Sequence, residues 1–142
     1  MPKSDFAAQV RAFSEKAKAR QAAIFKGSAE RVLERAGTPK AQGGRMPVDT
    51  GFLRNSARAS TEGVPTSEGG DPPLVFAAMK VGDTVTVGWT AAYALRMEHG
   101  FMGEDALGRT YAQQGNGFLR AEVQNWPFIV AEVTQEVQAL IP

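Results

Sequence analysis

Hydrophobic residues recur at helical spacing over the first part of the chain. The stripe begins with Phe6, Val10, Phe13 and Ala17. Spacings of four, three and four residues place these side chains on one face of a helix. The same periodicity drifts onward to the first glycine-proline cluster. We therefore predict one continuous helix over residues 4–36.

The predicted helix is longer than a small core can cover. A helix over residues 4–36 would span about 50 Å. Gly27 weakens its middle by about 1 kcal/mol relative to alanine and marks a candidate bend. Gly37 and Pro39 supply a stop signal at its end. We expect part of this helix to pack against something other than its own core.

A second helical stripe runs to the C-terminus. Its members alternate in steps of four and three: Leu119, Val123, Trp126, Val130, Val133, Val137 and Leu140. This pattern predicts a helix over residues 118–142 whose apolar face belongs to the core. Pro127 cannot donate to the backbone ladder, so we expect the helix to kink or restart there.

The middle of the chain carries the β signal. Residues 74–81 and 84–89 are rich in β-branched and apolar residues and flank the pair Gly82-Asp83. A two-residue connection of this kind is typical of an antiparallel hairpin. Residues 91–100 follow, and their alanine, leucine and methionine favour a helical turn over a third strand.

Polar segments rich in glycine and proline separate these elements. We expect extended loops at residues 37–47, 60–73 and 101–117. The last loop contains four larger apolar residues, namely Phe101, Met102, Leu107 and Tyr111. Such side chains are expected where a loop docks on a partner. We predict that this loop is mobile in a free subunit and ordered in an assembly.

These elements together predict an α+β fold. A long N-terminal helix and a C-terminal helix are expected to pack on a small antiparallel β-sheet, with extended loops. A length of 142 residues suits one domain over 1–142. Within it, residues 1–36 form the long helix, 37–117 the motif turn, hairpin and loops, and 118–142 the C-terminal helix.

Composition argues against several kinds of site. The chain has no cysteine and a single histidine, His99, which excludes disulfides and thiolate metal sites and argues against a His-rich site. No apolar run approaches the length of a membrane span. The N-terminal residues lack the apolar core of a secretory signal. We expect synthesis in a reducing cytoplasm and no membrane association.

Charge is divided unevenly along the chain. Residues 1–45 hold ten Lys/Arg against four Asp/Glu, whereas residues 46–142 hold six against eleven. Three interpretations of this division are open. The basic part could bind nucleic acid, it could contact the acidic face of a neighbouring subunit, or it could simply be a solvated helix. Phe13 and Phe25, the aromatic residues among the basic ones, both fall on the apolar stripe. Base stacking is therefore not supported.

Motifs for catalysis are lacking. The chain has no phosphate-binding loop, dinucleotide-binding glycine pattern, zinc-protease motif or serine nucleophile elbow. Glu98-His99 is the best candidate for metal binding or proton relay, but adjacent side chains point apart and no second histidine joins them. Glu104-Asp105 is interpreted as a solvated pair. We predict no catalytic residue, no cofactor and no metal site.

Three short motifs follow one another along the chain. In the first, MPVDTGFLRNS, the residues that define the motif are Pro47, Val48, Asp49, Thr50, Gly51, Leu53, Arg54 and Ser56. In AAYALRMEHG they are Tyr93, Ala94, Glu98 and Gly100. In GFLRAEV they are Phe118, Leu119 and Arg120. In order and spacing, over roughly residues 46–125, the set resembles the neck and tail-completion proteins of long-tailed bacteriophages, a family often called minor tail protein Z-like.

The resemblance implies a structural virion protein and not an enzyme. Such a protein forms a ring at the phage head–tail junction and bridges the head-closure ring to the tail around the DNA channel. The implied partners are further copies of the chain in a six-fold or twelve-fold ring, head-closure or adaptor proteins, and tail-tube or terminator proteins. DNA would pass through the lumen without sequence recognition. The protein would be made in the bacterial host cytoplasm and reside in the virion neck or tail.

The resemblance also suggests roles for the motif residues. Asp49 and Thr50 are expected to cap a turn that carries Leu53 inward and leaves Arg54 to meet an acid. One interpretation is a polar network among Arg54, Glu98 of the second motif and Arg120 of the third. The other is that these residues only fix the fold of one subunit.

Other functions remain open from the sequence. One alternative is a tail terminator subunit, which caps tube polymerisation in the same kind of particle. Another is a small cellular protein that binds nucleic acid through its basic helix. A hydrolase that depends on Glu98 or on a metal is the weakest of the alternatives.

Overall fold

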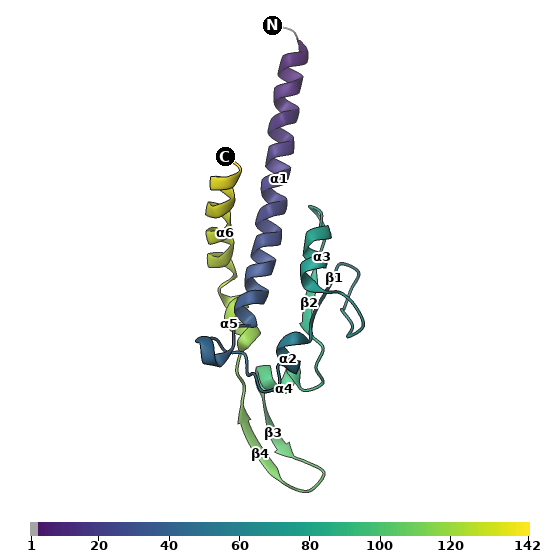
Figure 1. The fold of residues 1–142 in the computed structure, drawn as a ribbon, viewed down its shortest axis with the longest axis vertical. Helices are drawn as coiled ribbons and strands as arrows, with labels where there is room; N and C mark the ends of the chain where they lie inside the picture. Colours follow the sequence, from purple (N-terminus) through teal and green to yellow (C-terminus); the bar gives the residue numbers. More distant parts are fainter. Residues whose placement is uncertain (1–2) are drawn as a thin grey trace.

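A single long helix forms the axis of the molecule (Figure 1). The structure is a computed structural model and describes residues 3–142. Helix α1 spans Lys3–Ala36, which confirms the predicted N-terminal helix. It is continuous through Gly27, so that glycine does not interrupt it. A Cβ atom at Gly27 would lie 2.9 Å from Val133 Cγ1, so the glycine instead permits close packing of a second helix.

The C-terminal segment forms two helices that run back along α1. Helix α5 spans Phe118–Gln124 and α6 spans Trp126–Leu140, with a break at Asn125 immediately before the helix that contains Pro127. The predicted restart is therefore confirmed. The buried side chains of α6 are Ile129, Val133 and Val137, which pack with Ala23, Ile24 and Val32 of α1.

The break changes which C-terminal residues face the core. The predicted stripe is confirmed at Val133 and Val137, which are buried. Its members Val123 and Leu140 are exposed, whereas Ile129, outside the stripe, is fully buried. That prediction extended one apolar stripe across the expected restart at Pro127. The turn at Asn125 resets the phase, so positions before and after it do not share one face.

Polar contacts at the surface reinforce the pairing of α1 with α6. Arg31 contacts Glu136 at 2.7 Å and Glu132 at 3.4 Å. Arg35 contacts the same Glu132 carboxylate at 2.7 Å. The hydrogen bond from Arg31 to Glu136 raises the pKa of the arginine and lowers that of the glutamate.

A third helix occupies the segment that was predicted to be a strand. Helix α3 spans Pro72–Ala78, so the strand expected at 74–81 is wrong. Two prolines open this helix, where a missing N–H costs nothing and a fixed φ is favourable. Its Phe76 is buried and packs with Ala29 of α1. Gly82 and Asp83 form a turn from α3 toward the next strand and not a hairpin.

The β structure consists of two small antiparallel sheets and not one. Strand β1 (Ala57–Ser60) pairs with β2 (Thr86–Trp89), with Ala57 opposite Trp89 and Ser60 opposite Thr86. Strands β3 (Gly100–Glu104) and β4 (Thr110–Gln114) form a separate hairpin. The loop expected over 101–117 is therefore wrong for most of its length, because its residues pair with one another.

Three short helical elements complete the fold. They are η1 (Lys40–Gln42), α2 (Phe52–Asn55) and α4 (Ala94–His99). The last confirms the predicted helical turn in the second motif. The α+β fold with long N-terminal and C-terminal helices is confirmed as well.

Two elements extend beyond the packed body at opposite ends (Figure 1). The end of α6 reaches Arg20, whose Nε donates to the carbonyl of Ile141 at 2.8 Å. Residues 3–19 of α1 project past this point for about 25 Å. The β3–β4 hairpin projects from the other end. Within residues 3–142, no helix combines the length and apolar character that crossing a membrane requires.

Candidate functional site

The first motif forms a tight turn into α2. Gly51 precedes the helix with φ 85°, a left-handed conformation that glycine adopts without strain. Thr50 Oγ1 accepts a long hydrogen bond of 3.4 Å from the N–H of Phe52. Asp49 is exposed, and the residue that precedes α2, Gly51, makes no side-chain cap, so the capping role expected of Asp49 is not seen. Leu53 points inward and is buried, as predicted.

Ser56 ties this turn to the segment that leads into the second motif. Its hydroxyl donates to the carbonyl of Leu53 at 2.7 Å and accepts from the N–H of Ala91 at 3.2 Å. Its carbonyl accepts from the hydroxyl of Thr90 at 2.9 Å. The sequence singled out Ser56 but did not predict this clamp between segments 35 residues apart.

Apolar side chains from all three motifs meet in one cluster. Its buried members are Met46, Leu53, Ala91 and Phe118. The ring of Phe118 also lies edge-on to Trp89, with centroids 5.1 Å apart. Tyr93 stays exposed at the entrance to α4 and lies 6.3 Å from Phe52, centroid to centroid. The three motifs are therefore brought together around a common core.

Glu98 connects the second motif to the third. Its carboxylate accepts the backbone N–H of Leu119 at 3.0 Å and of Arg120 at 2.7 Å. These N–H groups belong to the first turn of α5 and have no partner within that helix. Gly117, the residue at the helix start, has no side chain that could serve them. Glu98 therefore caps α5 from another element, and the negative charge suits the helix N-terminus.

The neighbours of Glu98 shape the start of the hairpin. The guanidinium of Arg120 lies 2.9 Å from Nδ1 of His99. Gly100 has φ 87°, and a Cβ atom there would lie 2.5 Å from the carbonyl oxygen of Gln113. Only glycine fits this position, which explains why the second motif ends with it.

Arg54 does not join the polar network expected from the sequence. No carboxylate among residues 3–142 lies within ion-pair distance of Arg54, and both oxygens of Glu98 are used by backbone N–H groups. Arg120 reaches Glu98 through its backbone and not its guanidinium. The Arg54–Glu98–Arg120 network is therefore wrong within one subunit, because the glutamate serves as a helix cap.

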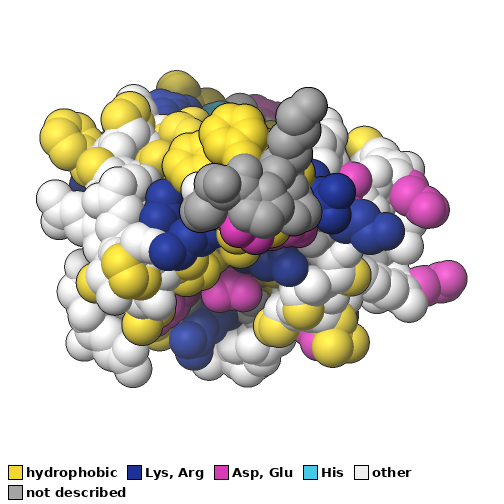
Figure 2. Space-filling view, turned by 90° about the horizontal axis from the view of Figure 1, so that it is seen from above, with side chains coloured by type: hydrophobic (Ala, Val, Ile, Leu, Met, Phe, Trp, Pro, Cys, Tyr) yellow, Lys and Arg dark blue, Asp and Glu magenta, His cyan; other side chains and the backbone are white. Residues whose placement is uncertain are grey.

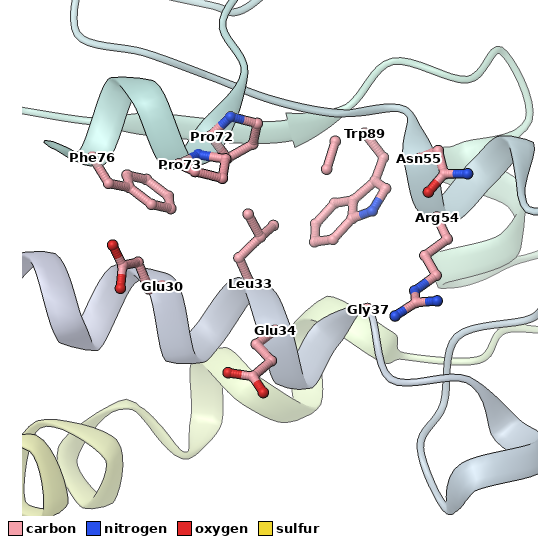
Figure 3. Close-up of a pocket in the computed structure, with 11 residues that line it drawn as sticks. Glu30, Leu33, Glu34, Gly37, Arg54, Asn55, Pro72, Pro73, Phe76 and Trp89 are labelled. Carbon is pink, nitrogen blue, oxygen red and sulfur yellow. The ribbon is translucent and has the colours of Figure 1, made fainter. Parts of the chain in front are cut away.

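Arg54 instead lines a cleft between α1, α2 and α3 (Figure 3). The cleft has a volume of about 710 Å³. Its apolar surface comes from Leu33, Phe76 and Trp89, and the Nε1 atom of this tryptophan is buried with no hydrogen-bond partner in residues 3–142. The sequence did not predict this cleft. Two adjacent prolines that open α3 were the available signal, since they indicate a helix start.

The β3–β4 hairpin is held together by its own polar contacts. The Asp105 carboxylate accepts the N–H groups of Leu107 and Arg109, each at 2.9 Å, and pairs with the guanidinium of Arg109 at 2.6 Å. The backbone N–H of Arg109 is the main reason that the pKa of Asp105 is lowered. Asp105 therefore organises the turn and is more than a solvated acid.

Aromatic packing joins the two strands of the hairpin, but other apolar side chains on it are uncovered. Phe101 lies under the guanidinium of Arg96, 4.1 Å from ring centroid to Cζ, and 6.3 Å from the ring of Tyr111. Met102 and Leu107 remain 83% and 78% exposed. Their predicted burial between chains is not tested by a single subunit.

Residues 3–142 contain no group of three or more His, Asp or Glu side chains placed to hold a metal ion. No protein-family model, curated protein or solved structure matches the chain.

Proposed function

We propose that this chain is a structural subunit of a phage neck, which forms a ring at the head–tail junction and bridges the head-closure ring to the tail. The family resemblance of the three motifs is the origin of this proposal. Support comes from their arrangement, because residues of all three motifs build one common core. In this role the motifs are scaffold, and the protein is not an enzyme.

The observation that carries the proposal is the exposure of apolar side chains at both ends of the molecule. Phe6 and Phe13 on the projecting part of α1 are each 71% exposed, and the hairpin tip is similarly uncovered. Monomeric proteins seldom leave extended apolar elements in water. Contacts with other copies in a ring, or with the head and tail proteins on either side of it, would cover both ends.

The proposal includes the surroundings of the ring. Copies of the chain would assemble with six-fold or twelve-fold symmetry, between head-closure or adaptor proteins and tail-tube or terminator proteins. DNA would pass through the lumen and contact the ring without sequence recognition. The location would be the virion neck or tail, after synthesis in the host cytoplasm. In a variant of this proposal, the ring lies at the end of the tail tube and acts as the tail terminator.

A nucleic-acid-binding protein is the second candidate. Figure 2 shows Lys and Arg side chains beside hydrophobic ones at the end of the molecule that carries the N-terminus. Such a basic end would attract a phosphate backbone. Its binding would weaken steeply with salt, whereas assembly through apolar contacts would not.

Electron microscopy and sedimentation of the purified protein test the proposal. We expect closed rings, and we expect that phage particles assembled without the protein have filled heads but no attached tails. Normal tailed particles in its absence would rule out a neck role. Monomers at all concentrations that bind duplex DNA with a steep salt dependence would favour the second candidate.

A further inference from the structure

The projecting part of α1 requires a partner for its apolar stripe. Residues 3–19 lie beyond the cover of α6, and Phe6, Val10 and Phe13 are all more than half exposed. A single helix of this length is marginal in water without tertiary packing. The stripe has the four-three spacing of a helix that packs lengthwise into a groove or against another helix.

Charge argues against bundling of these segments with one another. Residues 3–20 hold five Lys/Arg against two Asp/Glu, a net charge of +3. Parallel packing of such segments around a ring axis would bring like charges together. An acidic, partly apolar surface is the complementary partner.

The cleft between α1, α2 and α3 offers such a surface. Glu30 and Glu34 line it from one face of α1 and Arg54 from α2, so acidic side chains outnumber basic ones there, and all three are exposed. Neither carboxylate has an ion-pair partner among residues 3–142, and neither has Lys16. Lys16 follows Phe13 by three residues and so lies beside the apolar stripe. Unpaired charges of opposite sign therefore accompany the stripe and the cleft.

The apolar part of the cleft fits side chains from one helix face. Leu33 and Phe76 approach from α1 and α3, with the Trp89 ring between them and α2 (Figure 3). A volume of about 710 Å³ is in the range that holds several large side chains. A second groove of about 360 Å³, between α1, β2 and α5, has no acidic residue in its lining. The charge pattern therefore selects the larger cleft.

We propose that the N-terminal segment of α1 in one copy docks into the α1–α2–α3 cleft of the next copy, with Phe6, Val10 and Phe13 inside and Lys16 facing Glu30 and Glu34. The surfaces on the two copies differ, so the contact is head-to-tail. A head-to-tail contact repeats from copy to copy and closes into a ring where the rotation permits. This inference rests on the proposed ring and identifies the contact that builds it.

Disulfide crosslinking tests the contact directly because the chain has no cysteine of its own. We would introduce Ser14→Cys, next to the stripe, and Glu34→Cys, in the cleft. Within one copy these positions lie on the same helix about 30 Å apart. A disulfide requires Cα atoms within about 7 Å, so a bond between positions 14 and 34 must join two copies. Asn55→Cys, also in the cleft, provides a second receptor position.

The expected result is a ladder of covalent multimers from the double-cysteine protein. A mixture of the two single-cysteine proteins should give dimers and stop there. Strong crosslinking of Ser14→Cys alone, without 14–34 or 14–55 bonds, would mean that the helices pair with each other and would overturn the docking. Rings that form without any 14–34 or 14–55 bond would also overturn it and would leave the neck proposal intact.

Exchange of charges gives an independent readout in the cysteine-free protein. Glu30→Lys with Glu34→Lys should weaken association of copies by about tenfold, because each exposed ion pair contributes modestly. Adding Lys16→Glu should restore part of that loss, and Lys40→Glu on η1 is the matched control. Absence of rescue together with absent crosslinks would overturn the inference. A covalent ladder without closed rings would uphold the docking and remove the neck role.

Discussion

The carboxylate of Glu98 accepts the backbone N–H of Arg120 at 2.7 Å. With the neighbouring bond to Leu119, it supplies the cap that Gly117 at the start of α5 cannot provide. The second and third motifs are thereby joined through backbone N–H groups, which any residue except proline could supply at those two positions. The glutamate is therefore the member of this contact that substitution will disturb.

Replacement of Glu98 by alanine should destabilise the protein by about 2 kcal/mol. Two N–H groups of α5 lose a charged acceptor, and the loss of a helix cap costs about 0.5–2 kcal/mol by itself. Glu98→Gln keeps one acceptor oxygen and should lose less. Urea unfolding would measure both, with the exposed Glu104→Ala as control. Equal unfolding midpoints for wild type and Glu98→Ala would contradict the capping role.

Replacement of Arg54 by alanine should change the stability of an isolated subunit by less than about 1 kcal/mol. The side chain is exposed and has no acidic partner among residues 3–142, so its removal leaves no charge buried and unpaired. Thermal unfolding of the dilute subunit would measure the change. A loss of about 3–5 kcal/mol would instead indicate a buried ion pair and restore the network expected from the sequence.

Replacement of Gly27 by leucine should weaken the packing of α1 on α6. Even a Cβ atom at this position would lie 2.9 Å from Val133 Cγ1, so a larger side chain must push the helices apart. Overpacking of this kind costs about 1–3 kcal/mol. Ala19→Leu, on the exposed part of the same helix, is the matched control. Comparable unfolding free energies for the two variants would show that the helices are not tightly packed at Gly27.

The helices were predictable because their periodicity is strong and local. The long stripe from Phe6 onward predicted the N-terminal helix, and Pro127 predicted the restart within the C-terminal segment. Only part of the buried face of α6 was predictable: Val133 and Val137 belong to the predicted stripe, but Ile129 does not, and the break at Asn125 separates the face of α5 from that of α6. Existence of a helix follows from pattern, whereas its buried face depends on where the chain breaks.

The β structure was harder to predict because it depends on distant pairing. Strand β1 consists of small and polar residues and is a strand only because β2 lies beside it. In the segment 74–81, apolar and β-branched residues favoured a strand, but Pro72 and Pro73 start a helix and the packing of Phe76 on α1 holds it. The cleft combines residues from α1, α2 and α3, and no local pattern indicates such a combination.

The β3–β4 turn should loosen in acid. The pKa of Asp105 is lowered in the fold, chiefly by the backbone N–H of Arg109. A lowered pKa means that the stabilisation is present above the ordinary aspartate pKa and is lost as pH falls through the lowered value. Amide NMR signals of Leu107 and Arg109 should report this transition. Asp105→Asn should abolish it, whereas Glu104→Gln should not; an unchanged titration in Asp105→Asn would assign the transition to another group.

Assembly should protect the sulfur of Met102 from oxidation. This side chain is 83% exposed at the hairpin, yet β3 and β4 already pair within one subunit, so backbone protection alone would not report a contact between copies. Mild peroxide should therefore oxidise Met102 readily in the free subunit and slowly in the assembled ring. Met46 is fully buried and should stay reduced in both states, which provides an internal control. Equal oxidation of Met102 before and after assembly would mean that this face of the hairpin remains in solvent and is not an arm between subunits.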